Sequence, residues 1–324
     1  MAIGALSIVV PAHDEAAVIE RCLAAMFRGA HPGELEVVVV CNGCRDDTAE
    51  RARSFGADVV VVETPIASKH LALTLGDEVA TRFPRVYVDA DVEVPIEALR
   101  EVAATLAAGA VVAAPPCRHE LRGRSVLVRA FYRVWARMPY ATEDMVGAGV
   151  YALDAEGRSR FDAFPTIIAD DEFVRRLAPP SDRRSTRGTP FVIHPPRTIA
   201  GVANIMTRAR TGNLELEAGA ATLAGDGAEG HTGPRRTLAA IARRPSTWPA
   251  APVYLATMAV AERRARAKVA RGELDRWERD DTARTMGTDP RGSCGHPASI
   301  PCSPHGHREQ DLRAPDPAQG GLRP

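Results

Sequence analysis

The sequence has no uninterrupted apolar run of about 18 residues, the length that a membrane-spanning helix requires. It has no excess of charge either, because 41 Lys and Arg residues balance 41 Asp and Glu residues. A nucleic acid would therefore meet no overall basic field. The first residues lack the basic region of a secretory signal peptide, and the six cysteines do not suggest a disulfide scaffold. These absences favour a cytoplasmic protein that does not bind nucleic acid.

The first half of the sequence alternates short apolar runs with amphipathic stretches. Helical spacing of apolar residues marks the stretches between the runs, at residues 15–28, 47–55 and 69–81. The β-branched, apolar runs predict strands at residues 6–11, 35–40, 59–62 and 86–88. Such strands, each separated by a helix, indicate a Rossmann-like α/β fold with a mostly parallel sheet covered on both faces. Ligands of such sheets bind beyond the carboxyl ends of the strands.

The second half is less regular, and its composition changes twice. It predicts strands at 111–114, 147–153 and 191–194, and helices at 125–138 and 170–177. Residues beyond Met286 are rich in Gly, Pro, His and Ser without periodicity, which is typical of disorder. We therefore expect a catalytic domain at 1–232, a helical extension at 233–285 and a disordered tail at 286–324.

Two carboxylates follow the strand predicted at 86–88, at Asp89 and Asp91. A strand would point both to the same face, where two unpaired carboxylates repel each other and lose hydration. A divalent cation removes that cost, and oxygen ligands suit Mg²⁺ or Mn²⁺. A solvated turn or a helix N-cap is the alternative explanation, since Asp is common in both.

Several segments, taken in order, resemble the family 2 glycosyltransferases with the GT-A fold over residues 5–215. Residues 6–15, LSIVVPAHDE, resemble the opening strand and P-x-x-N-E loop, with Asp14 where Asn is usual. Residues 41–48, CNGCRDDT, are similar to the D-D-G-S-x-D-x-T loop that receives the nucleotide base, with Asn42 in place of Asp. Residues 68–73, SKHLAL, resemble the G-K-x-x-A-L segment, and Asp89 and Asp91 match the D-x-D motif.

The resemblance continues into the second half. Residues 147–153, GAGVYAL, are similar to the glycine-rich strand entry near the donor sugar and acceptor. Residues 169–177, ADDEFVRRL, resemble the helix that carries the catalytic base, which places Asp170 at the base position and Asp171 as the fallback. Residues 208–213, RARTGN, resemble a Q/R-x-x-R-W segment without its Trp, which argues against a polymer-extending synthase.

The resemblance implies an inverting transfer of a sugar from a nucleotide-sugar donor, with a UDP-sugar as the first expectation. Mg²⁺ or Mn²⁺ at Asp89 and Asp91 would neutralise the leaving diphosphate, and Asp170 would accept the proton of the acceptor hydroxyl. The acceptor, lipid-linked or small, stays open. The residues expected to bind the nucleotide sugar are Pro11, Glu15, Asn42, Asp46, Lys69, Asp89, Arg208 and Arg210, and Gly147 and Gly149 form the loop near donor sugar and acceptor.

Other functions stay open. A nucleotidyltransferase of similar fold would need a glycine- and arginine-rich loop after the first strand, where this chain has His13, Asp14 and Glu15. A noncatalytic nucleotide-binding module is kept open by the substitutions at Asp14, Asn42 and Ala169. Cys41 and Cys44 form a C-x-x-C pattern that redox proteins also carry. The tail contains Cys and His residues of the types that zinc accepts, without elements to preorganise them.

The segment 248–268 joins an apolar half to a strongly basic half. One interpretation is an amphipathic helix in peripheral contact with anionic lipid at the inner face of the membrane, which would suit a lipid-linked acceptor. The other is a helix that packs back on the catalytic domain. The sequence supports both equally.

Overall fold

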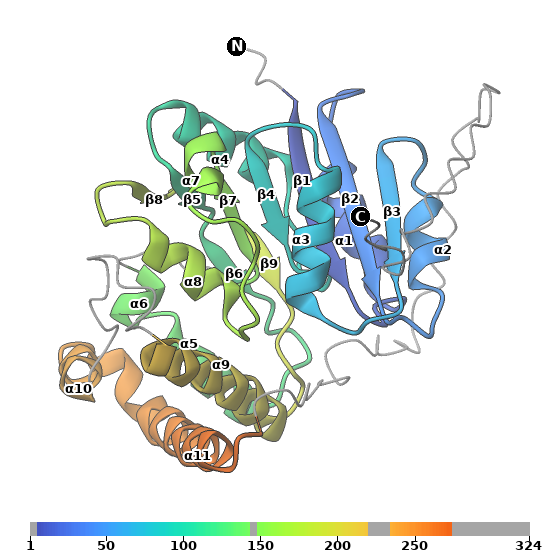
Figure 1. The fold of residues 1–324 in the computed structure, drawn as a ribbon. Helices are drawn as coiled ribbons and strands as arrows, with labels where there is room; N and C mark the ends of the chain where they lie inside the picture. The colour runs from blue at the N-terminus through green and yellow to red at the C-terminus, as the bar shows by residue number, and fades with distance from the viewer. Residues whose placement is uncertain (1–4, 143–147, 220–233, 274–324) are drawn as a thin grey trace, which may run out of the picture. The chain divides into compact units, whose positions relative to one another are not determined.

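A computed structural model of the protein describes residues 5–142, 148–219 and 234–273 (Figure 1). All of these residues belong to one compact unit, Met1–Met286. The tail predicted at 286–324 lies outside the described residues. Within them, no helix combines the length and the apolar character needed to cross a membrane.

The centre of the fold is a seven-stranded sheet with the strand order β3-β2-β1-β4-β7-β5-β8. Strand β7 runs antiparallel to its neighbours β4 and β5, and the other pairs are parallel. A small second sheet pairs β6 (Cys117–His119) with β9 (Phe191–Ile193). The mostly parallel α/β sheet expected from the sequence is confirmed. Its strands are β1 (Leu6–Ala12), β2 (Leu35–Asn42), β3 (Val59–Thr64), β4 (Arg85–Val88), β5 (Val112–Ala114), β7 (Val150–Leu153) and β8 (Arg183–Ser185).

Alternate residues of the strands build two cores, one on each face of the sheet. Ile8 and Val10 of β1 join the core beneath α1 (Ile19–Phe27), α2 (Thr48–Arg53) and α4 (Ile96–Ala107). Val9 joins the opposite core, beneath α3 (Lys69–Val79) and α8 (Asp170–Leu177). The short helix α7 (Ala155–Ser159) follows β7. This two-sided burial explains why the strands are almost continuously apolar.

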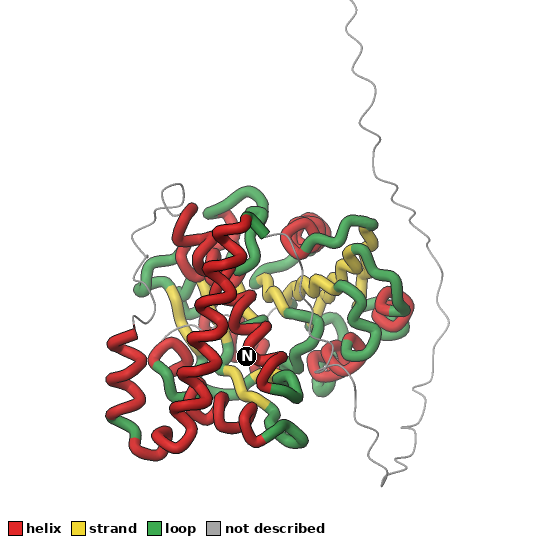
Figure 2. Tube along the Cα trace, turned by 90° about the horizontal axis from the view of Figure 1, so that it is seen from below, coloured by secondary structure: helices red, strands yellow, loops and turns green. Residues whose placement is uncertain are grey.

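A third core lies within a group of helices, here called the helical layer, at the bottom of Figure 1. Helices α9 and α11 run side by side (Figure 1), and Figure 2 views the molecule from below. Tyr254, Ala261 and Ala265 of α11 are buried, and α11 packs against α9 and α5. One face of the segment 248–268 is therefore covered by protein. The layer comprises α5 (Val126–Trp135), α6 (Pro139–Thr142), α9 (Ile199–Gly219), α10 (Pro234–Ala242), the 3₁₀ helix η1 (Pro245–Ala250) and α11 (Ala251–Arg271).

Strand β1 continues through Pro11 to Ala12, although the sequence suggested that it stops at the proline. Ser7 donates its N–H to Pro84, toward β4, so alternate residues direct their N–H groups to that side. Pairing with β4 ends at Val9. Pro11 therefore lacks an N–H where no partner strand needs one.

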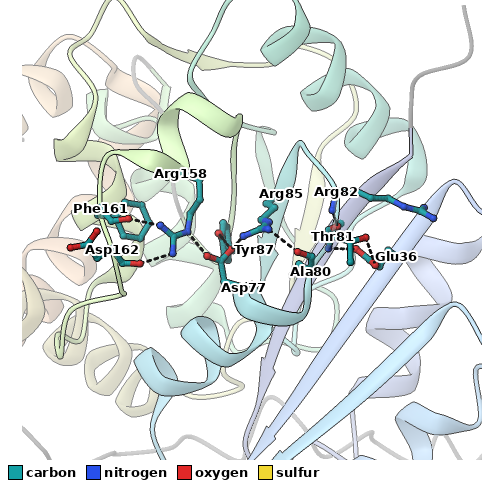
Figure 3. Close-up of polar contacts among 11 residues, drawn as sticks. Glu36, Asp77, Ala80, Thr81, Arg82, Arg85, Tyr87, Arg158, Phe161 and Asp162 are labelled. Carbon is teal, nitrogen blue, oxygen red and sulfur yellow. Dashed lines mark hydrogen bonds and ion pairs between the residues drawn. The ribbon is translucent and has the colours of Figure 1, made fainter. Parts of the chain in front are cut away.

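A buried ionic cluster joins α3 to β4 and α7 (Figure 3), and we call Asp77, Arg85, Tyr87 and Arg158 the Asp77 cluster. Arg85 Nη1 lies 2.5 Å from Asp77 Oδ1, and Arg158 pairs with Asp77 Oδ2. Tyr87 donates its hydroxyl to Asp77 Oδ1 at 2.7 Å. The arginines also donate to backbone carbonyls, at Ala80, Phe161 and Asp162. The charged groups of the cluster pair with one another inside the protein, with only Arg85 Nε left without a partner among its described polar atoms, and this internal pairing indicates a structural role.

Candidate active site

The site expected at the sheet edge is built from strand ends and two helix starts. Asp89 follows β4, and Gly149 precedes the antiparallel β7, so both lie at the same edge. Lys69 is the first residue of α3, and Asp170 is the first of α8. Ser68, which stands where the family has Gly, caps α3 by accepting a hydrogen bond from Leu71 N. The α/β topology thus brings residues about 100 positions apart to one place.

Lys69 lies between two carboxylates that the sequence assigned to different roles. Its Nζ is 2.7 Å from Asp89 Oδ1 and 2.8 Å from Asp170 Oδ1. Tyr151 donates its hydroxyl to Asp170 Oδ2 at 3.0 Å. We call Lys69, Asp89, Tyr151 and Asp170 the Lys69 cluster. It links the D-x-D turn directly to the candidate base.

The charges of this cluster alter its titration. Burial lowers the pKa of Lys69, but Asp170 and Asp89 outweigh it and hold that pKa above its ordinary value. Burial and then the charge of Asp170 raise the pKa of the neighbouring Asp171 to about 7. Asp171 Oδ1 accepts a hydrogen bond from Glu172 N at 2.8 Å. Lys69 therefore stays cationic, and the surrounding acidic groups outnumber it.

Gly149 makes close contact with Asp89. Its carbonyl accepts a hydrogen bond from Asp89 N at 2.8 Å. Its φ of +97° is unfavourable for other residues, and a Cβ there would lie 3.1 Å from Asp89 Oδ2. Glycine at this position therefore keeps one side of the Asp89 carboxylate open. Gly147, predicted to act with it, lies outside the described residues.

Asp89 and Asp91 lie in a turn after β4 rather than in the strand, so the strand alternation predicted for them does not apply. They do not cap a helix, because α4 begins at Ile96 with Pro95 as its N-cap. Arg21 of α1 donates to the Asp91 carbonyl at 3.4 Å. The side chain of Arg21 thus ties the backbone of this turn to α1.

The residues predicted to receive the nucleotide base connect the loops after β1 and β2. Asn42 is buried, and its Nδ2 donates to Ala12 O at 2.8 Å. Asp46 accepts hydrogen bonds from Ala16 N and Thr48 N, both at 3.1 Å. Glu15 is buried as well, and its N–H donates to Thr48 Oγ1 at 2.8 Å. Many of these polar groups therefore form hydrogen bonds that stabilise the loops themselves.

Asp14, Cys44 and Asp46 form a group that the sequence did not single out as metal ligands. One ligand atom of each lies within 4.8 Å of the others. Asp14 has a φ of +49° and accepts a hydrogen bond from Arg45 N at 2.6 Å. A hydrogen bond with Cys41 lowers the pKa of Cys44 to about 7. Because backbone amides already bind both carboxylates, the group is accounted for by the loop structure.

The two arginines predicted to bind phosphate lie on α9. Arg210 pairs with Glu262 of α11 at 2.6 Å and with Glu217 at 3.1 Å. Arg208 is exposed. No contact among the described residues joins Arg210 to the Lys69 cluster. The structure thus gives Arg210 a place between two helices.

The sequence analysis did not identify two residues that position Asp170 or the loop before it. Tyr151 lies inside the glycine-rich segment, where only the glycines drew attention. Glu215 of α9 accepts a hydrogen bond from Ile168 N at 3.2 Å, just before α8. Gly212 lets α9 approach that loop, since a Cβ there would lie 3.0 Å from the Ala169 Cβ. Only long-range packing reveals that α9 supports Asp170.

Comparison with known proteins agrees with this architecture. Residues 7–152 match the sequence profile of glycosyl transferase family 2. The mannosyltransferase PcManGT from Pyrobaculum calidifontis, solved with GDP-Man and Mn²⁺, is 22% identical, with a TM-score of 0.52 over 83% of this chain and 79% of that chain. Glucosyl-3-phosphoglycerate synthase from Mycobacterium tuberculosis, solved with Mn²⁺, UDP-Glc and phosphoglyceric acid, is 18% identical, with a TM-score of 0.46 over 66% of this chain and 78% of that chain. No curated protein sequence matches the chain.

Proposed function

We propose that the chain, whose residues 7–152 match the profile of glycosyl transferase family 2, is a glycosyltransferase that transfers a sugar from a nucleotide-sugar donor to an acceptor hydroxyl with inversion at the anomeric carbon. The observation that carries this proposal is Lys69, which contacts Asp89 and Asp170 at once. A group that binds the donor diphosphate and a group that deprotonates the acceptor must face the same anomeric carbon.

Asp89 and Asp91 form the donor end of the proposed site. Their carboxylate oxygens are the ligand type that Mg²⁺ and Mn²⁺ prefer, and Gly149 leaves Asp89 Oδ2 approachable. The Lys69 cluster has two carboxylates against one ammonium, which also suits a cation. When bound, such a cation would neutralise negative charge on the leaving diphosphate. Asp89 and Asp91 would hold it, and Lys69 would add a second positive charge.

Asp170 forms the acceptor end. Its carboxylate would accept the proton of the acceptor hydroxyl as that oxygen bonds to the anomeric carbon and the bond to the nucleoside diphosphate breaks. Tyr151 and Lys69 fix the carboxylate from two sides. With one base and no covalent intermediate, the displacement inverts the anomeric carbon. The acceptor is a lipid-linked or a small hydroxyl compound.

Pro11, Glu15, Asn42 and Asp46 would form the wall that receives base and ribose, with a UDP-sugar as first expectation and a GDP-sugar as second. Arg210 already pairs with Glu262 and Glu217, which neutralise its charge and compete with a phosphate for it. We therefore assign the diphosphate to Lys69 before Arg208 and Arg210.

A thermal-shift screen of UDP, GDP, CDP and TDP, each with and without Mn²⁺, tests the donor end. We expect one nucleotide to raise the melting temperature only when Mn²⁺ is present. Asp91→Asn should abolish that metal dependence, whereas Asp58→Asn, at an exposed position before β3, should keep it. An unchanged Mn²⁺ effect in Asp91→Asn would refute the metal assignment.

Turnover tests the acceptor end. Asp170→Asn should bind the identified nucleotide as the wild type does, while release of nucleoside diphosphate from the matching nucleotide sugar falls by about 10²–10⁴-fold, the contribution of a general base. Asp171→Asn is the matched control and should retain most of the activity. Wild-type turnover in Asp170→Asn, or a larger loss in Asp171→Asn, would reassign the base.

A further inference from the structure

A cavity of about 350 Å³ lies in the helical layer, between α10 and the connection from α5 to α6. Of the eight described residues that line it, five are arginines, and the others are Pro139, Ala239 and Ala240. We propose that this cavity binds an anion that carries phosphate groups, separately from the donor site. The arginines are Arg137, Arg235, Arg236, Arg243 and Arg244.

The described part of the chain places no carboxylate against the positive charge of this cavity. No acidic residue is among the described residues that line it, and within that part of the chain none of the five guanidinium groups forms an ion pair with a carboxylate. Two other arginines of the helical layer, Arg210 and Arg266, do have a carboxylate partner, since both pair with Glu262. Five like charges around one cavity repel each other, and a bound anion relieves that repulsion.

The geometry of the cavity also suits phosphate. Arg137 Nη1 donates to Arg133 O at 2.6 Å, and Arg244 Nη1 donates to Arg137 O. These backbone contacts anchor two guanidinium groups and leave their other N–H donors for a ligand. The small side chains of Ala239 and Ala240 leave space on the α10 face of the cavity. Planar guanidinium groups bind phosphate oxygens bidentately, so several of them around one space favour phosphate.

The size limits the ligand. A volume of about 350 Å³ lies at the lower end of the range for small-molecule sites, roughly 300–1,000 Å³. It accommodates a phosphate or diphosphate group with a small organic portion. A free phosphorylated metabolite and the headgroup of an anionic phospholipid share this chemistry.

Two exposed apolar residues lie on the elements that border the cavity. Leu238 of α10 is 53% exposed, and Trp248 of η1 is 56% exposed. Trp248 Nε1 donates to Ile241 O at 3.1 Å, which fixes the indole while its ring stays exposed. An amphipathic aromatic ring next to cationic groups is typical of contact with a lipid interface. Binding of a phospholipid headgroup would bring Trp248 into contact with the lipid, whereas binding of a free phosphorylated metabolite would not involve Trp248.

The test uses the full chain in EDTA, which removes divalent cations that could recruit diphosphate to Asp89 and Asp91. Inorganic pyrophosphate is titrated by calorimetry, and vesicles of phosphatidylcholine with or without phosphatidylglycerol are used in co-sedimentation. The cavity variant is Arg236→Gln with Arg243→Gln. The control is Arg263→Gln with Arg264→Gln, which removes the same charge from exposed positions of α11.

We expect the cavity variant to bind pyrophosphate or anionic vesicles at least tenfold more weakly than the wild type, and the control to bind them nearly as well. Without ligand, the melting temperature of the cavity variant should not fall below that of the wild type, because the substitutions remove two charges that repel their neighbours. Loss of vesicle binding in Trp248→Ala with pyrophosphate binding retained identifies the lipid source, and pyrophosphate binding alone identifies the soluble source. Equal losses in both double variants, or no binding of either probe by the wild type, would overturn the proposal.

Discussion

Helix α3 carries an ionic cluster at each end, and the two have opposite charge ratios. At its start, Lys69 is one cation between the carboxylates of Asp89 and Asp170. In its last turn, Asp77 is one carboxylate between the guanidinium groups of Arg85 and Arg158. Each cluster includes a tyrosine hydroxyl bound to a carboxylate, from Tyr151 and Tyr87, and these two rings stack with centroids 5.0 Å apart.

The clusters differ in what remains available for a ligand. The side chain of Asp77 is only 3% exposed, and the two arginines around it also bind backbone carbonyls. The side chain of Asp89 is 31% exposed and lies at the carboxyl edge of the sheet. A buried charge with every partner inside the protein serves the fold. A cluster with surplus charge at a ligand-binding edge can take a ligand, and this distinguishes the candidate site from the Asp77 cluster.

The largest effect on stability should come from a substitution that disrupts the Asp77 cluster. Asp77→Ala leaves the partly buried Arg85 and Arg158 without their carboxylate, so the free energy of unfolding should fall by about 3–5 kcal/mol. Urea denaturation measures this. Asp162→Ala is the control, because Arg158 contacts only the carbonyl of Asp162 and that side chain is exposed. A loss below about 1 kcal/mol in Asp77→Ala would show that the arginines find other partners.

A smaller effect should reveal the surplus negative charge near Lys69. The pKa of Asp171 is about 7 in the folded protein, against about 3.9 in an unfolded chain. The folded state therefore binds more protons, and its stability falls as the pH rises from about 4 to about 7. Asp171→Asn removes this pH dependence, so the stability of the variant relative to the wild type should rise by about 3 kcal/mol between pH 5 and pH 8. Parallel stability curves would contradict the assignment.

The smallest effect compares the two tyrosines. Tyr87→Phe and Tyr151→Phe each remove one hydroxyl from a carboxylate, and each should cost about 1 kcal/mol of stability. Only Tyr151→Phe should also lower turnover, several-fold and without a change in nucleotide affinity, because its partner is the proposed base. Steady-state kinetics beside calorimetry separates the two effects. Equal losses of turnover would mean that the stacked rings act as one unit.

The sequence predicted the elements near the sheet edge well, because period and motif are local signals. Strand and helix ranges in the first half agree with the structure to within a few residues, and α8 begins at Asp170 as expected. The motifs also selected Lys69, Asp89 and Asp170, which the fold brings together. Their mutual contact was not foreseen, since a motif assigns a role to each residue and does not give the distance between two of them.

The helical layer shows why the rest could not be predicted. The pairing of Arg210 with Glu262 joins residues 52 positions apart, and no periodicity identifies such partners. The segment 248–268 suited a lipid surface and a protein surface equally, because an apolar half joined to a basic half fits both. Packing against α5 and α9 covers one face. The roles of Asn42 and Asp46 are similarly divided, since their side chains also hold the loops that they were expected to use for binding.

Helix α9 supports the loop before Asp170 through Gly212 and Glu215, and it holds α11 through Arg210. Helix α9 therefore contacts both the loop before the candidate base and α11, two regions that are far apart in the sequence. A chimera that exchanged the residues after 233 for the helices of a relative would lose the pairing of Arg210 with Glu262 and would loosen the support beneath the candidate base. A chimera that keeps these contacts would therefore have to take α9 and α11 from the same parent protein.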